Sequence, residues 1–288
     1  MKKIKTTKFL PFIFLSPFLI LFGLFYIAPL IYGFYLSLFH QYGLRPPVFI
    51  GFKNYLQVFN DTNFWMSILN MTKFFLIQGS IMIGLALIFA LYIDNQKNRF
   101  RGFFRMVYYI PFAIPTAISG ILWGFMYSKS MSPFQSIFGI FGLHPDFLAS
   151  NALFWSIINI VTWEWTGYNM IIIYSGLQSI PRELYEAAHI DGAKRFDIIR
   201  YVKIPLIIPS LILSIVFTVI GTFQIFNEPY VLESMTFISP HFTPNLYIYT
   251  TAFSYGNFNF AAAMAIVLAL VTFAVSMIFM RFAGFKEE

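Results

Sequence analysis

The sequence contains no cysteine and little charge, and each shortage restricts what the chain can be. Without cysteine there is no disulfide framework, no thiolate metal site and no cysteine nucleophile. Charged residues make up 11% of the 288 residues, whereas an ordinary soluble domain has roughly 25%. Hydrophobic residues reach 58%, and the mean hydropathy is +0.71. Because a soluble fold cannot bury so much apolar surface, the composition predicts an all-α, polytopic membrane protein.

Motifs for catalysis and for nucleotide binding are missing too. The four histidines, His40, His144, His189 and His241, fall in predicted loops and have no partner at metal-ligand spacing. Neither an H-E-x-x-H nor a G-x-S-x-G motif occurs. A G-x-x-x-x-G-K-[ST] loop is also absent, so we do not expect the chain itself to hydrolyse ATP. We therefore predict a non-enzyme without catalytic residues, a metal site or a cofactor.

Six apolar stretches are long enough, at about 20 residues each, to cross a bilayer as helices. They are Leu10–Leu36, Phe74–Ile93, Phe104–Tyr127, Leu153–Leu177, Ile204–Phe226 and Phe260–Phe282. The first follows several lysines and so resembles a signal peptide, but it is too long and lacks a clear cleavage site, which indicates a retained span. We find no linker between soluble domains, so residues 1–288 are predicted to form a single transmembrane domain.

The positive charges alternate with these stretches. Fifteen of the 19 Lys and Arg residues fall in segments that share one side of the membrane when the N-terminus is inside. Only Arg45, Lys53 and Lys129 fall in the opposite loops, and Lys73 lies at the outer end of the second stretch. By the positive-inside rule, this split predicts six spans in the cell membrane with both termini in the cytoplasm. It also leaves no basic cluster for nucleic acid, so membrane lipid is the expected surrounding.

The segment between the fourth and fifth stretches, residues 178–203, is the most informative. Pro181 suits the first turn of a helix that continues over Glu183–Ile190. Gly192 can adopt a positive φ, and a second short amphipathic helix is expected from Lys194 to Val202. The pattern predicts a compact helix–turn–helix on the cytoplasmic surface. From periodicity alone, a solvated loop whose charges only set the topology is an equally good interpretation.

Several residues of this segment resemble a known motif. Glu186-Ala187-Ala188, followed by Gly192 and by Ile204-Pro205, resembles the EAA loop of ABC importer permeases. The longer pattern is similar to the carbohydrate subfamily of the maltose and glycerol-phosphate type, and it adds Ile180-Pro181, Tyr185, Asp191, Ala193 and Phe196. The resemblance extends along the chain through Gly51–Tyr55, Tyr108–Pro115 with Trp123, and Trp163 with Gly167–Met170. One departure is Leu232–Thr236, where family members often carry Gly-Gly-Pro.

The resemblance implies a type I ABC importer permease, which passes a sugar or sugar derivative from a binding protein to the cytoplasm. It implies that a groove of a separate ATPase subunit receives the coupling residues Glu186, Ala187, Ala188, Asp191, Gly192 and Ala193. The implied partners are a second, different permease subunit, two ATPase subunits and an external solute-binding protein. The candidate contacts for the binding protein are the outer loops Phe39–Trp65, Ser128–Asn151 and Asn227–Asn257.

Two helix faces carry the polar and aromatic side chains that a solute route needs, and the resemblance places the route on the same two helices. The face on the fourth stretch consists of Asn159, Trp163, Thr166, Gly167 and Met170. The face on the fifth stretch consists of Thr218, Gly221, Thr222, Gln224 and Ile225. We predict that these residues line the substrate path. Plain helix packing is the competing interpretation, because Gly and Thr also let membrane helices approach each other.

Glu164 is the one acidic residue deep in a predicted span. A charge at a helix centre costs roughly 2.5–3.5 kcal/mol on insertion scales, so such residues usually face a cavity or a partner. Glu164 lies about 100° around the helix from Trp163 and borders the proposed face. It either lines a wet route or makes a hydrogen bond between helices, and the sequence favours neither.

Two other classes of protein compete with the importer permease. A secondary transporter or channel for a small polar solute usually carries several intramembrane ionisable residues or visible paired halves, and here only Glu164 is deep. A membrane-embedded enzyme would need a catalytic constellation, and the sequence offers none.

Overall fold

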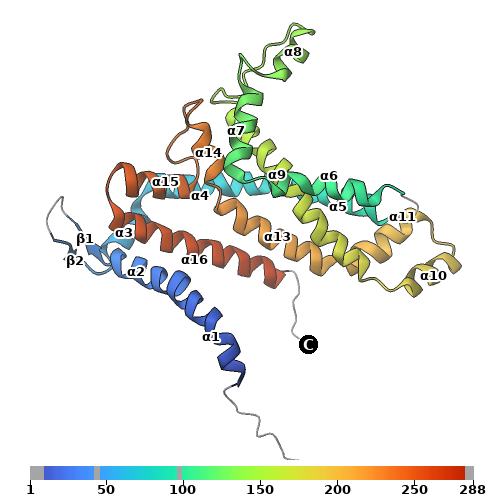
Figure 1. Ribbon diagram of the computed structural model, residues 1–288, viewed down its shortest axis with the longest axis horizontal. Helices are drawn as coiled ribbons and strands as arrows, with labels where there is room; N and C mark the ends of the chain where they lie inside the picture. The colour runs from blue at the N-terminus through green and yellow to red at the C-terminus, as the bar shows by residue number, and fades with distance from the viewer. Residues whose placement is uncertain (1–9, 42–45, 96–98, 283–288) are drawn as a thin grey trace, which may run out of the picture. The chain divides into compact units, whose positions relative to one another are not determined.

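The computed structural model describes residues 10–41, 46–95 and 99–282, which are almost entirely helical (Figure 1). Of the lysines and arginines used to predict the topology, Lys2, Lys3, Lys5, Lys8, Arg45, Lys97 and Lys286 lie outside these residues. The chain packs as two units, Met1–Thr62 with Ile248–Val267, and Asn63–Tyr247 with Leu268–Glu288. The prediction of a single domain over residues 1–288 stays a prediction.

The first unit contains a long apolar helical stretch, Phe14–Ser37. It contains α1 (Leu10–Phe22), the π-helical η1 (Gly23–Ile27), α2 (Ala28–Ser37), β1 (Phe39–His40), β2 (Val48–Phe49), α3 (Lys53–Asn60), η4 (Thr250–Ser254) and the first part of α16 (Phe258–Phe282). The strands β1 and β2 pair antiparallel, with Phe39 opposite Phe49. The amide of Asn54 donates to the carbonyls of Ser37 and Phe39, both at 2.8 Å, and so caps the end of α2.

The second unit carries most of the packing. It contains α4 (Thr62–Phe74), η2 (Phe75–Gly79), α5 (Ser80–Asp94), α6 (Arg101–Ala113), α7 (Thr116–Tyr127), α8 (Pro133–Gly139), α9 (Leu153–Gln178), α10 (Arg182–Ile190), α11 (Arg195–Asp197), η3 (Ile198–Lys203), α12 (Ile204–Leu206), α13 (Ile208–Phe223), α14 (Asn227–Leu232) and α15 (Pro244–Tyr249). Helix α9 packs against α5, α6 and α13 (Figure 1). The core between them includes Ala86 and Ala90 of α5, Met170 and Ile173 of α9, and Ile207.

Small residues let these helices approach closely. Ala86 and Ala90 are fully buried against α9. Gly167 of α9 lies under the backbone carbonyl of Tyr108 in α6, so that a Cβ at this position would overlap the carbonyl oxygen. Without a hydrophobic driving force between helices in lipid, such close contact supplies much of the association energy.

The helices agree with most of the predicted spans. Four helical stretches are long and apolar enough to cross a membrane, at Phe14–Ser37, Thr62–Asp94, Ile208–Leu232 and Phe258–Arg281. The 26-residue α9 coincides with the fourth predicted stretch and is about 39 Å long at 1.5 Å per residue, enough to span. The count of six spans and the cytoplasmic position of the termini are consistent with these helices and stay predictions.

The third predicted stretch is divided into two helices. Helices α6 and α7 are bent by 96° at a short break (Figure 1). Ile114 is extended between them, and Pro115 precedes the first residue of α7. The residue before a proline is driven out of the helical region by the proline ring, which explains the break.

The close packing of α6 on α9 gives a first prediction. Gly167→Ala should force these helices apart, because the added Cβ would meet backbone atoms that cannot rotate away. We expect a loss of about 1–3 kcal/mol, the usual cost of overpacking, seen as a lower midpoint of thermal denaturation in detergent. Gly84→Ala in α5 is the matched control, since nothing lies within 4 Å of its Cβ position. An equal fall in both variants would contradict the prediction.

Candidate functional site

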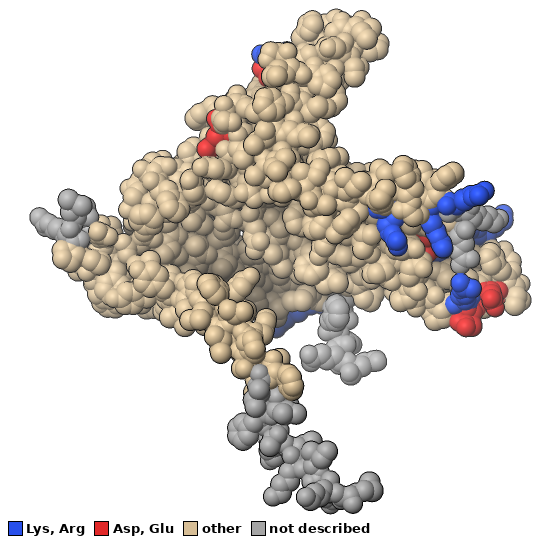
Figure 2. Space-filling view, in the orientation of Figure 1, with Lys and Arg blue, Asp and Glu red and all other residues tan. Residues whose placement is uncertain are grey.

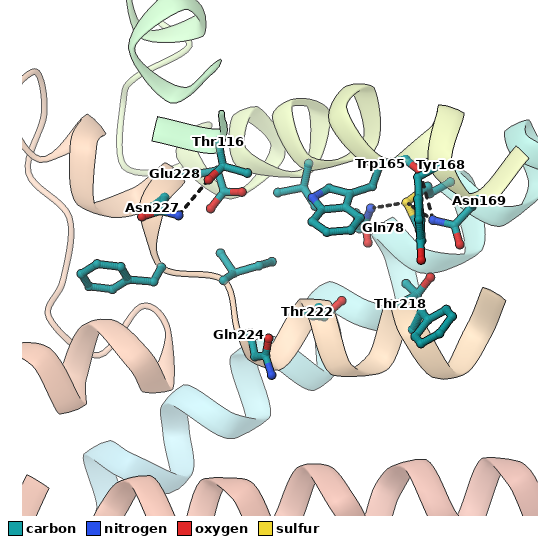
Figure 3. Close-up of a pocket in the computed structure, with 16 residues that line it drawn as sticks. Gln78, Thr116, Trp165, Tyr168, Asn169, Thr218, Thr222, Gln224, Asn227 and Glu228 are labelled. Atoms are coloured by element: carbon teal, nitrogen blue, oxygen red, sulfur yellow. Dashed lines mark hydrogen bonds between the residues drawn. The ribbon is translucent and has the colours of Figure 1, made fainter. Parts of the chain in front are cut away.

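A cavity of about 160 Å³ opens within the second unit. Its lining residues come from six elements, η2, α5, α7, α9, α13 and α14, and from the segment that joins α13 to α14 (Figure 3). They are Gln78, Met82, Thr116, Val161, Trp165, Tyr168, Asn169, Phe217, Thr218, Gly221, Thr222, Gln224, Ile225, Phe226, Asn227 and Glu228. The lining combines aromatic rings with hydroxyl, amide and carboxyl groups, and it contains no lysine or arginine.

Asn169 holds one end of the cavity together (Figure 3). Its Oδ1 accepts a hydrogen bond from Ser214 of α13 at 2.5 Å, and its Nδ2 donates to the carbonyl of Trp165 at 3.0 Å. Both Asn169 and Ser214 are buried. This pair therefore fixes α9 to α13 directly beside the cavity.

Gln78 offers the cavity a hydrogen-bond acceptor. The side chain is 1% exposed, and its Nε2 donates to the sulfur of Met82 at 3.2 Å. Its Oε1 has no hydrogen-bond partner among the described residues. Buried polar atoms are rarely left without a partner, so this oxygen is an unmet hydrogen-bond acceptor in the cavity wall.

Two carboxyl groups meet at the other end. Glu228 lines the cavity and is 4% exposed, while Glu164 is 1% exposed and lies next to both Glu228 and the hydroxyl of Ser119. Within the described residues, neither Glu164 oxygen makes a hydrogen bond of good geometry. Glu164 thus belongs to a buried acid pair between α9 and α14, and its partner rather than Glu164 itself lines the cavity. Glu228 was not predicted as a site residue, because residues 227–257 were expected to form an outer loop.

The two predicted path faces lie differently toward this cavity. All five residues predicted on the fifth stretch line it, namely Thr218, Gly221 and Thr222 of α13 and Gln224 and Ile225 just after it. None of the five predicted on α9 does so; the residues of α9 that line it are Val161, Trp165, Tyr168 and Asn169. At about 100° per residue these lie on the opposite side of the helix from Trp163, and their i, i+4, i+7 spacing was visible in the sequence.

The predicted face of α9 instead packs against neighbouring helices. Trp163 stacks edge-on against Trp123 of α7 with ring centroids 5.6 Å apart, and Met170 is buried in the core. The hydroxyl of Thr166 donates to the carbonyl of Thr162, and the amide of Asn159 donates to the Tyr127 hydroxyl at 2.7 Å. For these residues and Gly167, a role in the substrate path stays a prediction.

The loop after α9 has the predicted helix–turn–helix form. Pro181 is the N-cap of α10, and Gly192 has φ +77°, which confirms the expected turn. The amide of Ala193 donates to the carbonyl of Ala188 at 2.9 Å, and that of Gly192 donates to His189 at 3.1 Å. These two bonds form a Schellman motif, which ends α10 at a fixed angle.

Helix α10 presents a free surface. None of its residues is buried, and Ile190 is 86% exposed. On the face drawn in Figure 2, Lys and Arg side chains gather around α10, α11 and the neighbouring helix ends. The rest of this face shows few charged side chains. An exposed, rigidly terminated helix in a charged setting is suited to receive a soluble partner. Within the described residues, no group of three His, Asp or Glu side chains could hold a metal ion.

Comparison with known proteins settles the family. Residues 82–286 match the family described as binding-protein-dependent transport system inner membrane component. The chain belongs to this family. The lactose transport system permease protein of Rhizobium radiobacter is 32% identical over 96% of this chain and 94% of its own length. The trehalose/maltose transport system permease protein of Thermococcus litoralis is 30% identical over 97% and 95%.

The fold of the permease agrees with solved structures. A chain of a bacterial alginate ABC transporter, solved in complex with an alginate pentasaccharide-bound periplasmic protein, matches with a TM-score of 0.81. The match covers 96% of this permease and 94% of that chain at 22% identity. The permease therefore has the fold of ABC importer membrane subunits, as the sequence predicted, and it is an inner-membrane, multi-pass transport component.

The hydrogen bond between Asn169 and Ser214 can be measured by a double-mutant cycle. We expect Asn169→Ala and Ser214→Ala each to destabilise the permease, and the double variant to lose less than the sum. The coupling energy should be about 0.6–1.7 kcal/mol, the range of polar pairs between membrane helices, from thermal denaturation in detergent. Ser214→Ala combined with Asn159→Ala is the control, because Asn159 bonds Tyr127 instead. Strict additivity for the first pair would show that the bond contributes nothing.

Proposed function

We propose that this permease subunit carries a carbohydrate from an external binding protein to the cytoplasm, driven by ATP hydrolysis in separate subunits. The observation that carries the proposal is the similarity, over nearly the whole chain, to permeases named for lactose and for trehalose and maltose transport. The chain offers no P-loop, so the energy has to enter through another polypeptide.

The chemistry of the cavity supports a polyhydroxylated solute. Trp165 and Tyr168 supply aromatic rings, and the amide of Gln78 lines the wall with an oxygen that lacks a hydrogen-bond partner among the described residues. Thr222 and Gln224 add a hydroxyl and an amide from α13. Sugars combine apolar C–H faces with hydroxyl groups, and this mixture of rings and hydrogen-bonding groups matches them.

The coupling step is assigned to the loop at 178–203, with Glu186, Ala187, Ala188, Asp191, Gly192 and Ala193 as the contact residues. We infer that α10 docks in a groove of an ATPase subunit, and that closure of the ATPases displaces it. The Schellman turn at Gly192 keeps α10 at a fixed angle to η3 and α13, so the displacement reaches helices that line the cavity. A second permease subunit, two ATPase subunits and the binding protein complete the assembly.

Purification of the intact complex from membranes is the direct test of this function. We expect an ATPase subunit and a second permease to co-purify, and the binding protein to retain a sugar identifiable by mass spectrometry. A chain that moves solute alone into vesicles without ATP would contradict the proposal.

Gly192→Val tests the coupling turn. A β-branched residue resists φ +77°, so the valine should distort the end of α10 while the membrane helices stay intact. We expect normal amounts of assembled complex and loss of ATP-dependent sugar uptake in proteoliposomes. Gly84→Val is the matched control, because Gly84 lies in the helical backbone of α5 and nothing lies within 4 Å of its Cβ position. Normal uptake by the Gly192 variant would count against the coupling role.

Trp165→Ala tests the cavity as the solute route. Removing the ring should raise the KM for uptake about threefold to tenfold, the worth of one aromatic contact, and leave the amount of complex unchanged. Trp155→Ala serves as control, since Trp155 lies on the same helix with 56% of its surface exposed and does not line the cavity. An unchanged KM in the Trp165 variant would place the route elsewhere.

A further inference from the structure

Four side chains tie the α10 loop to the ends of the helices that line the cavity. We propose that Asp94, Gln178, Tyr185 and Lys203, hereafter the Asp94 clamp, are positioning residues that carry the displacement of α10 into α5, α9 and α13. This inference rests on the proposed coupling role of the loop and assigns the connection between the loop and the cavity.

The carboxylate of Asp94 is the centre of the clamp. Asp94 is the last residue of α5, and its Oδ2 accepts a hydrogen bond from Nζ of Lys203 at 2.5 Å. Its Oδ1 accepts from Nε2 of Gln178, the last residue of α9, at 2.8 Å. Lys203 ends η3, which leads into α12 and α13. One carboxylate therefore holds the ends of three segments at fixed separation.

Tyr185 connects α10 to the same point. Nζ of Lys203 lies 5.5 Å from the centre of the Tyr185 ring, a cation–π geometry. Burial and the nearby charge of Asp94 raise the pKa of Tyr185 to about 12. The ring also packs against the core formed by α5 and α9. Because α10 buries none of its residues fully, this half-buried ring is a main side-chain attachment of the helix to the bundle.

The position of Asp94 is unfavourable for α5 alone. A negative charge at a helix C-terminus is repelled by the helix dipole, so the residue does not serve the stability of its own helix. The ion pair with Lys203 offsets this repulsion, and it is shielded from water, with side-chain exposures of 9% for Asp94 and 15% for Lys203. Shielded pairs are screened less by salt than surface pairs, and their geometry is held more firmly.

Each of the three segments that the clamp joins leads to the cavity wall. The helix that ends at Asp94 contributes Met82 and follows Gln78, α9 contributes Trp165, and η3 continues toward Thr222 of α13. A push on α10 that moved only its covalent neighbours would reach α9 and η3. The clamp adds α5, which no chain connection links to the loop.

The chain has no cysteine, so a single introduced thiol reports on the cavity. Gln224 lines the cavity and is exposed, which makes Gln224→Cys a suitable reporter. In the complex with its partner permease and ATPases, we expect the rate of maleimide labelling at this position to change when ATP is bound. Asp94→Asn, Lys203→Gln and the double variant should reduce this ATP-dependent change about tenfold and leave ATP hydrolysis in place.

Lys129→Gln with Asp146→Asn is the matched control. This pair has a similar ion-pair distance of 2.7 Å but lies in the loop around α8, away from α10. In the complex of permeases and ATPases, assayed without the binding protein, its variant should leave the labelling change intact. The double variant Asp94→Asn/Lys203→Gln guards against a folding artefact, since it leaves no unpaired charge.

Three results would overturn the positioning role of the Asp94 clamp. An undiminished labelling change in the clamp variants would overturn the clamp while the coupling role of α10 stands, provided that Gly192→Val abolishes the change. Failure of all three clamp variants to assemble would show that the Asp94–Lys203 pair is needed for folding. That result would also overturn the positioning role of the Asp94 clamp. No labelling change in the unmodified complex would reject the proposed function together with the clamp.

Discussion

Close contact between α9 and its neighbours is the constraint on which the rest of the second unit depends. In a bilayer, apolar side chains gain nothing by leaving lipid for one another, so helices are held by shape and by a few buried polar bonds. Here the shape comes from Ala86 and Ala90 on α5 and from Gly167 on α9. The polar bond comes from Asn169 and Ser214. Without these contacts α9 would have no fixed face toward the cavity.

The same helix connects the parts of the proposed mechanism. One side of α9 packs against α6 and α7, the other lines the cavity with Trp165 and Tyr168, and its end leads directly into the α10 loop. Three of the helices that wall the cavity, α5, α9 and α13, are connected again through Asp94, close to α10, the last of them through Lys203 of η3. A membrane subunit without a motor of its own needs such a continuous path, because a flexible loop would absorb the displacement instead of passing it on.

The elements that the sequence predicted correctly are those whose backbone conformation depends on local chemistry. The turn at Gly192 and the helix after Pro181 follow from the backbone preferences of glycine and proline, and both were predicted. The break at Ile114 follows in the same way from Pro115. Helical periodicity identified α9 and α13 as candidates for the route. It could not say which side of α9 faces the cavity, because that depends on neighbours far away in the sequence.

The residues that no pattern suggested are those paired across long sequence distances. Asp94 and Lys203 are 109 residues apart, and each alone resembles an ordinary topology-setting charge. In the sequence Glu228 resembles a loop residue. In the structure it lies beside Glu164 and lines the cavity. Gln78 lies in an apolar stretch of the sequence, where no polar residue at helical spacing marks it as part of a polar face. Only the tertiary arrangement gives these side chains a common location.

The distance between α10 and α5 during the ATP cycle tests the central claim most directly. Spin labels at Glu183→Cys and Ile88→Cys would attach only at these two positions of the chain, since it has no cysteine. A second pair at Trp155→Cys and Tyr230→Cys would report on the separation of α9 and α14, two helices that line the cavity through other residues. If α10 is rigidly connected to α5, ATP binding leaves the first distance unchanged, because α10 and α5 move together. The second distance then changes. A shift of the first distance with the second unchanged would show that α10 moves alone, and would contradict the account.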